Sequence, residues 1–536
     1  MATNKTNTEN SLPTKEEKPK AADPAQVDIS DSDIGEMVRA RVRQVEAEIT
    51  EKKELELAPD FIRACLYCNE LGDGLLFAVL HRDRFVFNAS AGEWHVWSGA
   101  HWKRDVCGFA LEAVDEAARI YLRESMRISG EIQGIISGGS EGDIGHLSKI
   151  RMALERRVKK LRSQKGRTAC LEFARTCKDP LAVTGEMFDA NPWLLACANG
   201  VIDLQTGLFK EGRPADYLSM ASPVQWKGID TPAPLWEKTL GEIFHNNLEL
   251  ISFIKRYLGY CLTGSTRDNV FLLLHGQGRN GKTLLASILS YVLGPLARPI
   301  PSEMLLDQGR IRNSAGPSPD IMMLRALRIA FASESDEGRR FNAGRIKLFS
   351  GGDELTGRNP HDKHPITFTP THKLMLLTNE KPAAPASDFA FWERLLLVPF
   401  TVSFVSREPQ KANERKANRD LLAQLQKEAP GILAWLVWGC LEWQREGLNP
   451  PRSVTEATEQ YRRDEDIIAD FIDERCVVEP GAVGFSSEIY SAFAEWYESN
   501  LGKRVPSQNW LGKQLHKTYE KTKRDGRIAY FGIAVR

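Results

Sequence analysis

The stretch FLLLHGQGRNGKTLL, residues 271–285, decides the fold. Its apolar start, 271–274, is typical of a buried parallel strand, and residues 284–293 are typical of an apolar helix. Between them, residues 276–283 fit the phosphate-binding pattern G-x-x-x-x-G-K-[ST]. Glycines let the backbone turn tightly enough for its N–H groups to face phosphate oxygens, and the helix adds its positive N-terminal end. The stretch therefore predicts an α/β fold with a nucleoside triphosphate site.

The motif assigns a task to its residues. Lys282 would reach the β- and γ-phosphates, and the Thr283 hydroxyl would hold Mg²⁺. The residues predicted to surround the nucleotide are Gly276, Gly278, Asn280, Gly281, Lys282, Thr283 and Leu284. ATP and Mg²⁺ are the predicted cofactors, and ATP is preferred over other nucleoside triphosphates on general grounds alone.

Length and composition limit the class of protein. A chain of 536 residues suggests three or four domains, and 42% apolar residues support real cores. Lys+Arg and Asp+Glu are both 71, so the net charge says nothing about a nucleic-acid partner. The nine cysteines are scattered and odd in number, which is typical of a reduced, cytosolic protein. We expect no membrane partner, because no apolar run reaches the length of a membrane span and no signal peptide is present.

The chain divides into six segments by composition and pattern. They are a disordered tail (1–32), a charged helix (33–57), an α+β domain (58–228), an α/β ATPase domain (229–404), a helical subdomain (405–454) and a C-terminal domain (455–536).

Within the α+β segment, short aromatic runs predict strands at 85–87, 93–97 and 101–103. Its tryptophans favour a small β core over stacking on single-stranded bases. Helices are expected at 106–127 and 145–178. A glycine-rich mobile loop is expected at 129–145. The second helix carries a basic face made of Arg156, Arg157, Lys159, Lys160 and Arg162. A solvated face is the default interpretation of these residues, and a contact with nucleic acid is the alternative.

The last two segments are expected to be helical and winged-helix. Trp435, Trp438 and Trp443 are assigned to the core of the helical subdomain. Beyond it, a helix at 487–498, a helix at 507–521 and a strand at 527–535 suggest a winged helix. The basic second helix carries Lys513 and Lys517, which would contact duplex DNA; a solvated or protein-docking face is the alternative.

Three polar residues mark the ends of further apolar runs in the ATPase segment. Glu334 ends an apolar strand and would orient Mg²⁺ or the attacking water, although Asp336 and Glu337 close behind it leave the exact acid open. Asn379 ends the next strand and is placed to sense the γ-phosphate. Arg394 stands before the last apolar strand and needs a partner; in a ring ATPase it would reach the neighbour's nucleotide. A monomeric P-loop kinase would leave this arginine unexplained.

Five blocks in this order resemble a superfamily 3 helicase of the phage/plasmid and poxvirus-type primase-helicase branch. They are GQGRNGKT, RIAFASES, IKLFSGGDELTGRNPHDKHPITFTPTHKL, LLTN and FWERLLLVPF. Upstream, DRFVFNASAGEWHVWSGAHW, NPWLLACANGVIDLQTG and FIKRYLGYCLTGSTRDNVFLLLHG resemble the same branch, so the likeness covers residues 60–536. It implies a multidomain α/β protein with an AAA+-like P-loop core.

The resemblance also implies a homohexameric ring that translocates on single-stranded and forked DNA using ATP. In that family the third block forms a hairpin in the central channel, with strands here at 354–359 and 366–376. Lys363 at its tip is the first candidate for gripping phosphates and His364 the second, while Arg358 matches a position that the family keeps basic. The implied setting is replication of a phage, plasmid or other mobile element in the cytoplasm of a bacterial host.

Two departures from the family pattern matter. Glu393 stands where the branch often has a first arginine, which leaves Arg394 as the one finger candidate of its block. Only about 60 residues precede the first family-like block, too few for a polymerising domain. We therefore expect no primase activity in this chain, and a separate primase or origin-binding protein as partner. An ATP-switched DNA-binding, initiator or defence platform that does not unwind DNA is the alternative function.

Overall fold

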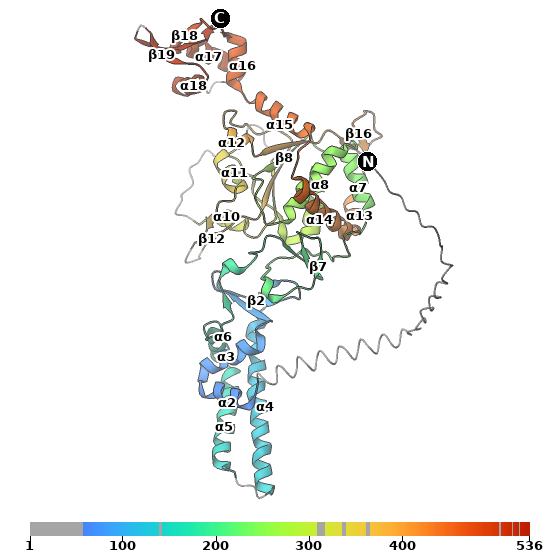
Figure 1. The fold of residues 1–536 in the computed structure, drawn as a ribbon, viewed down its shortest axis with the longest axis vertical. Helices are drawn as coiled ribbons and strands as arrows, with labels where there is room; N and C mark the ends of the chain where they lie inside the picture. The colour runs from blue at the N-terminus through green and yellow to red at the C-terminus, as the bar shows by residue number, and fades with distance from the viewer. Residues whose placement is uncertain are drawn as a thin grey trace, which may run out of the picture. The chain divides into compact units, whose positions relative to one another are not determined.

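The computed structural model describes residues 57–138, 142–307, 317–334, 339–360, 365–502, 505–516, 518–524 and 526–536 (Figure 1). The predicted tail at 1–32 and almost all of the predicted helix at 33–57 lie outside these residues. The described chain forms two compact units, one of residues 57–72 and 118–159 and one of residues 73–117 and 160–536. The single domain predicted at 58–228 is therefore divided between two units.

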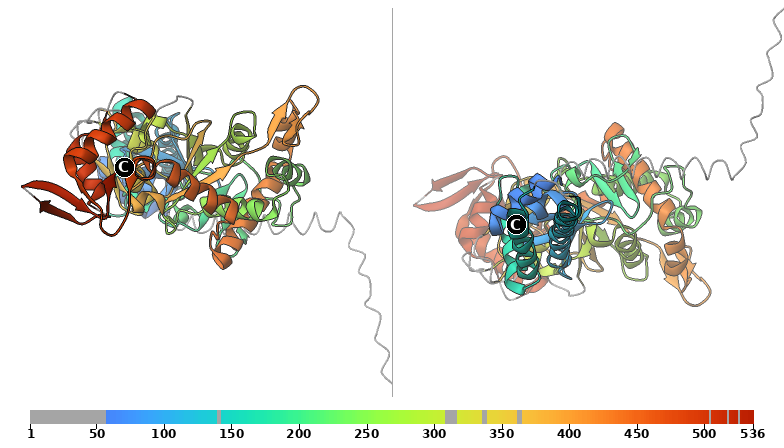
Figure 2. Two further views of the ribbon diagram at one scale, coloured as in Figure 1. Left: turned by 90° about the horizontal axis from the view of Figure 1, so that it is seen from above. Right: turned by 90° about the horizontal axis from the view of Figure 1, so that it is seen from below.

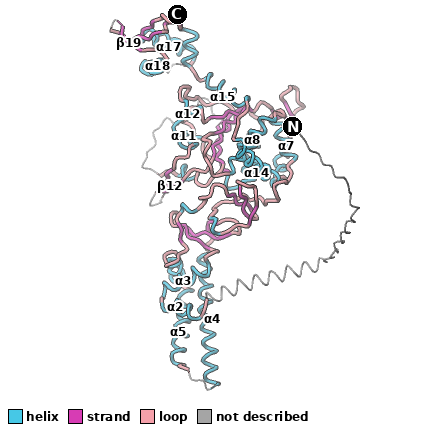
Figure 3. The backbone as a smooth tube through the Cα atoms, in the orientation of Figure 1, coloured by secondary structure: helices cyan, strands magenta, loops and turns pink. Residues whose placement is uncertain are grey.

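The described residues of the first unit are helical (Figure 3). Its helices, three of which continue into the second unit, are α2 (Pro59–Tyr67), α3 (Asn69–His81), α4 (Phe109–Gly138) and α5 (Ile144–Leu161). Glu124 of α4 is buried, and its carboxylate accepts hydrogen bonds from Arg63 at 3.1 Å and Arg127 at 2.8 Å. The pairing satisfies a carboxylate that burial would otherwise destabilise.

Two helix predictions in this region are wrong. α4 continues to Gly138, through most of the predicted loop at 129–145, despite the low helix propensity of its glycines; Ile132 and Ile135 are partly buried on this stretch. The predicted helix at 145–178 is two helices, α5 and α6 (Gln164–Ala174). Ser163 separates them and caps α6 by accepting a hydrogen bond from the Gly166 N–H.

Two small sheets precede the ATPase segment. They contain β1 (Phe85–Asn88), β2 (Glu93–Trp97), β3 (Trp102–Arg104) and β4 (Ala182–Val183) in the order β3-β2-β1-β4, and β5 (Leu194–Cys197), β6 (Gly200–Asp203) and β7 (Phe209–Lys210) in the order β5-β6-β7. The predicted strands are confirmed. Trp102 is 1% exposed and its indole N–H donates to the Pro214 carbonyl at 2.9 Å, so this tryptophan belongs to a β core.

A parallel five-stranded sheet forms the centre of the second unit. Its strands are β8 (Phe271–His275), β9 (Ala297–Pro299), β10 (Ile329–Glu334), β13 (Lys373–Thr378) and β14 (Leu395–Pro399), in the order β14-β8-β13-β10-β9. Side chains alternate between its two faces: Leu272 and Leu274 join one apolar cluster, Phe271 and Leu273 another. Both faces are covered, which explains the continuous apolar run that the sequence shows.

Helices pack closely beside this sheet. They are α7 (Pro234–Ile243), α8 (Leu248–Leu262), α9 (Lys282–Leu293), α10 (Pro319–Met323), α11 (Ala343–Ser350), α12 (Phe389–Trp392), α13 (Leu421–Lys427), α14 (Ala429–Glu446) and α15 (Arg452–Asp464). α8 and α14 approach so closely that a Cβ on Gly259 would lie 2.0 Å from the Cys440 nitrogen. Trp435 and Trp443 are buried as predicted, whereas Trp438 is 38% exposed, so its assignment to the core is wrong.

Two local predictions need correction. The predicted hairpin exists as β11 (Leu355–Gly357) and β12 (Ile366–Phe368), but its second strand stops at Phe368, and Lys373 begins a strand of the main sheet. The segment predicted as helical from residue 405 begins instead with β15 (Ser403–Val405) paired to β16 (Glu414–Lys416), and its helices start at Leu421.

The C-terminal residues have their own apolar core of nine buried residues, among them Phe471, Phe493 and Tyr530. The elements are α16 (Ile467–Arg475), β17 (Cys476–Val477), β18 (Val483–Phe485), α17 (Ser486–Asn500), α18 (Gln508–Leu515), β19 (Lys521–Arg524), β20 (Arg527–Phe531) and β21 (Ala534–Val535). Figure 2 shows β19 and β20, in dark red, as an extended two-stranded arm. The helix predicted at 507–521 ends at Leu515, because residues from Lys521 pair with β20.

None of the helices in the described part of the chain is both long and apolar enough to cross a lipid bilayer.

Candidate nucleotide site

The carboxyl ends of four parallel strands lie side by side and form one edge of the main sheet, the edge that runs across the strands. The pairing places His275 of β8 beside Thr378 of β13 and Pro399 of β14, and Thr378 beside Glu334 of β10. The glycine loop follows His275 and Asn379 follows Thr378, so both begin at this edge. Ligands of open α/β sheets bind outside such an edge.

The glycine loop, residues 276–281, has a backbone that other residues would not tolerate. A Cβ on Gly276 would lie 2.4 Å from the Phe400 carbonyl oxygen. Gly281 precedes α9 with a φ of 93°, in the left-handed region, and a Cβ there would lie 2.8 Å from Ile243 Cδ1. No side chain caps α9, so its first N–H groups face the loop without a side-chain acceptor.

Lys282, the first residue of α9, is 5% exposed. Its ammonium donates to the Gly276 carbonyl at 2.6 Å, to Asn280 Oδ1 at 3.1 Å and to Asn379 Oδ1 at 3.1 Å. All three acceptors are uncharged, and no carboxylate among the described side chains pairs with this ammonium. Burial therefore lowers the pKa of Lys282 from 10.5 to about 8.

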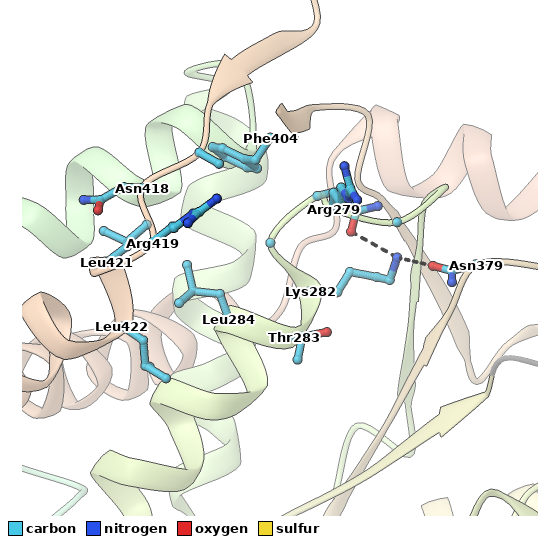
Figure 4. A pocket seen from close by; sticks show the side chains of 14 residues that line it. Arg279, Lys282, Thr283, Leu284, Asn379, Phe404, Asn418, Arg419, Leu421 and Leu422 are labelled. Atoms are coloured by element: carbon cyan, nitrogen blue, oxygen red, sulfur yellow. Dashed lines mark hydrogen bonds between the residues drawn. The ribbon is translucent and has the colours of Figure 1, made fainter. Parts of the chain in front are cut away.

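A cavity of about 450 Å³ opens beside the loop. Figure 4 shows Lys282, Thr283 and Asn379 on one side and Phe404, Arg419, Leu421 and Leu422 on the other. Leu284, Ala417 and Asn418 complete the lining, together with the loop backbone. The site thus has a polar end at the lysine and, opposite it, a wall that is apolar at Phe404, Leu421 and Leu422 and also carries Arg419.

The apolar wall was missed by sequence reasoning. Phe404 lies in β15, which the Arg279 carbonyl anchors by accepting the Phe404 N–H at 2.7 Å. Asn418, Arg419, Leu421 and Leu422 come from the start of the segment predicted as a separate helical subdomain. No spacing or composition in 404–422 distinguishes these residues in the sequence. They are recognised only because the folded chain returns to the glycine loop.

The structure brings together most of the predicted nucleotide residues. Gly278, Asn280, Gly281, Lys282, Thr283, Leu284 and Asn379 all line the cavity. Thr283 is exposed in the first turn of α9. The backbone of Glu334 ends β10 at the same edge of the sheet, beside Thr378. Among the described residues, no group of three or more His, Cys, Asp or Glu side chains is placed to hold a metal ion by itself.

Arg394 lies elsewhere in the chain's own fold. It precedes Leu395, which pairs with Phe271 at the amino end of β8, whereas the glycine loop leaves the carboxyl end. Its Nη1 donates to the Ala390 carbonyl at 2.7 Å, and its Nε is buried without a hydrogen-bond partner among the described residues. Within one chain the structure does not bring Arg394 to Lys282.

The predicted DNA-binding residues are only partly described. Lys363, His364 and Lys517 lie outside the described residues. Arg358 follows β11, and its backbone exchanges hydrogen bonds with Ser318. Lys513 is exposed on α18.

Comparison with known proteins identifies relatives. Residues 74–245 match the family described as D5 N terminal like. A "Putative helicase" of Acanthamoeba polyphaga mimivirus is 30% identical over 332 residues, which are 60% of this chain and 34% of that protein. A "Putative helicase" of Frog virus 3 is 24% identical over 387 residues, covering 59% and 40%. A "Putative primase" of African swine fever virus is 24% identical over 460 residues, covering 78% and 46%.

The chain therefore spans less than half the length of these curated relatives. Among solved structures, the apo C-terminal region of NrS-1 aligns with 85% of this chain and 98% of its own, at 11% identity and a TM-score of 0.42. The family match and the viral relatives confirm the resemblance that the sequence motifs predicted.

Proposed function

We propose that this chain, which carries the helicase region of the D5-type primase-helicases, is an ATP-dependent DNA helicase that serves replication of a mobile element. The single observation that carries the proposal is the buried Lys282 ammonium, held by three uncharged oxygens. A buried charge without a counter-ion is costly, so this position favours an anionic ligand. A triphosphate supplies that charge beside the N-terminus of α9.

The cavity fits the rest of a nucleotide. With phosphates at Lys282, a base would extend toward Phe404, Leu421 and Leu422, which offer a ring face and two aliphatic side chains. Asn379 would exchange its contact with Lys282 for one with the γ-phosphate. The carboxamide is thereby placed to report whether the γ-phosphate is present.

The donor atoms also fit Mg²⁺. Thr283 lies in the first turn of α9, after β8, and Glu334 ends β10 on the same side of the sheet. A hydroxyl and a carboxylate are hard oxygen ligands, the type that this cation prefers. Bound there, the cation would neutralise charge on the phosphates. Glu334 would also orient the attacking water, and Lys282 would hold the β- and γ-phosphates in line.

Hydrolysis is proposed to need a second copy of the chain. Arg394 lies at the edge of the sheet opposite the nucleotide site, so it would complete the site of a neighbour in a ring. Six copies are proposed from the resemblance alone. A ring would place the β11–β12 hairpin in its channel, where Lys363, His364 and Arg358 would contact DNA phosphates.

The C-terminal residues are proposed as a winged helix that holds duplex DNA. α17 and α18 pack in one apolar core with the antiparallel β18-β20-β19 sheet. Lys513 is exposed on α18, and Lys517 follows that helix. β19 adds the exposed cations Lys521, Lys523 and Arg524, the arrangement expected of a recognition helix beside a wing.

Strand displacement on a forked substrate tests the proposal. We expect wild-type protein to hydrolyse ATP and displace the strand, and Lys282→Ala to do neither. Lys363→Ala should keep basal ATP hydrolysis and lose strand displacement. Lys178→Ala changes an exposed lysine that is distant from Lys363 in sequence, and it serves as the control. Hydrolysis without displacement in the wild type would favour an ATP-switched DNA-binding platform.

A further inference from the structure

Helix α5 presents a row of cations to solvent, and we propose that this row binds the phosphate backbone of nucleic acid. The α5 basic face is defined here as Lys149, Arg156 and Lys159, with Met152 between the first two. All four are exposed. This face shares no residue with the nucleotide cavity, the β11–β12 hairpin or the C-terminal residues.

Helical geometry puts these side chains on one side of α5. Successive residues are rotated by about 100°, so Lys149, Arg156 and Lys159 fall within about 80° of one another. They span about 15 Å along the axis at roughly 1.5 Å per residue. Ile150, Leu154 and Val158 are buried and form the inner stripe of the same helix. Figures 1 and 2 show α5 lying beside α4.

The three cations of the α5 basic face form no ion pair with a described residue, unlike some of their neighbours on α5. Arg151 pairs with Glu155 at 2.7 Å, and Arg157 donates to Asn69 at 2.6 Å. No residue that the structure describes forms an ion pair with Lys149, Arg156 or Lys159. The helix carries Lys149, Arg151, Arg156, Arg157, Lys159 and Lys160 against a single acidic residue, Glu155.

The positive charge of α5 is local, because Lys+Arg and Asp+Glu balance at 71 each over the whole chain. Like charges on one exposed face repel one another, and a polyanion relieves that repulsion. A membrane is a weaker candidate: near an anionic bilayer each cation contributes only about 1 kcal/mol, and the apolar stripe of α5 that could insert is already buried in the protein. Met152 alone, 49% exposed, adds apolar surface among the cations.

The dimensions suit a nucleic-acid strand. Phosphates follow one another at about 3.4 Å along the axis of each duplex strand, so about 15 Å of helix passes four or five of them. Three long, flexible side chains can each reach a phosphate over that length. Contacts of this kind position the strand without reading its sequence.

Salt dependence of binding tests the proposal in the full chain, without nucleotide. The test variant is Lys149→Glu/Arg156→Glu/Lys159→Glu. The matched control is Lys178→Glu/Lys227→Glu/Arg452→Glu, which changes three exposed cations elsewhere by the same charge. Affinity for a fluorescent duplex and a fluorescent single strand is measured between 50 and 200 mM salt. Each lost phosphate contact lowers the slope of log K against log salt by about 0.9.

We expect the test variant to lose about 2.7 from that slope on duplex DNA, which over a fourfold change in salt is about 40-fold in relative affinity. The control should keep the wild-type slope. The melting temperature by circular dichroism, unchanged in both, shows that each variant is folded, and Lys149→Gln/Arg156→Gln/Lys159→Gln replaces the reversal if it is not. An unchanged slope in the test variant, or an equal loss in the control, overturns the proposal. So does loss of binding to phosphatidylserine vesicles with DNA binding intact.

Discussion

The charge of Lys282 makes nucleotide affinity depend on pH in a direction that the geometry fixes. Burial lowers the pKa of this lysine from 10.5 to about 8 in the structure, where its ammonium meets uncharged oxygens. Phosphate oxygens beside the ammonium favour its charged form and return the pKa to about 10.5 or above. Binding therefore takes up a proton wherever the free protein has lost one, and affinity falls as pH rises through about 8.

The size of the effect follows from the two pKa values. With a pKa of about 8 in the free protein and about 10.5 in the complex, the apparent Kd rises about tenfold between pH 7 and pH 9. That is about 1.4 kcal/mol of binding free energy. Proton uptake rises from about 0.1 per site at pH 7 to about 0.9 at pH 9.

Titration calorimetry with ADP in EDTA, in buffers of different ionisation enthalpy, measures both quantities. Excluding metal removes any contribution from its ligands. His275, at the end of β8, adds no slope, because burial lowers its pKa below 6.5 and the ring stays neutral over this range. Lys282→Arg keeps its charge throughout and serves as control: weaker binding is acceptable, but its affinity should not vary between pH 7 and 9. A flat wild-type profile, or the same slope in Lys282→Arg, refutes the reasoning.

Four further predictions test other parts of the structure. Gly281→Ala places a side chain at a φ of 93° against Ile243, so nucleotide binding should be lost and melting temperature lowered by a few degrees, by scanning fluorimetry. Phe404→Ala should weaken ATP at least about fivefold but leave inorganic triphosphate unchanged in competition assays. Burial lowers the pKa of Lys373 from 10.5 to about 7. The unfolded state therefore binds more protons, and the free energy of unfolding rises between about pH 7 and 10, by up to about 1.4 kcal/mol per pH unit. Lys373→Met should abolish this rise in urea titrations. Arg394→Ala and Lys282→Ala, each inactive alone, should recover about a quarter of wild-type hydrolysis when mixed, because one site in four then combines both intact residues; no recovery contradicts action between subunits.

Local chemistry made the centre of the fold predictable. The strand, the glycine loop and the helix at 271–293 lie next to one another in sequence, and each residue type of the motif has one conformational or chemical reason to be there. Asn379 was found because it ends an apolar run, and parallel pairing then carries it to the glycine loop. The family resemblance supplied the expected order of these parts, and the structure supplied their distances.

Features created by tertiary packing were not predictable in the same way. Phe404 is an ordinary apolar residue in the sequence, and it lines the cavity because β15 returns to Arg279. Leu422 reaches the same cavity from α13. Gly130 and Gly134 favour a loop in the sequence, yet they lie in the interior of α4, which continues through them despite a propensity loss of about 1 kcal/mol each. The helix expected to reach residue 521 stops at Leu515, because β-pairing competes for the residues beyond it.

The position of Arg394 shows what topology adds to motif order. In sequence this arginine follows Asn379 by 15 residues, and nothing in that spacing says which nucleotide it would serve. Since β14 runs parallel to β8, Arg394 begins the strand at one edge of the sheet while the glycine loop leaves β8 at the other. Five residues at roughly 3.3 Å each separate the two edges by about 16 Å, more than an arginine side chain can span. If hydrolysis needs this guanidinium, it must come from another copy of the chain, so loss of activity in Arg394→Ala and recovery by mixing are consequences of strand direction.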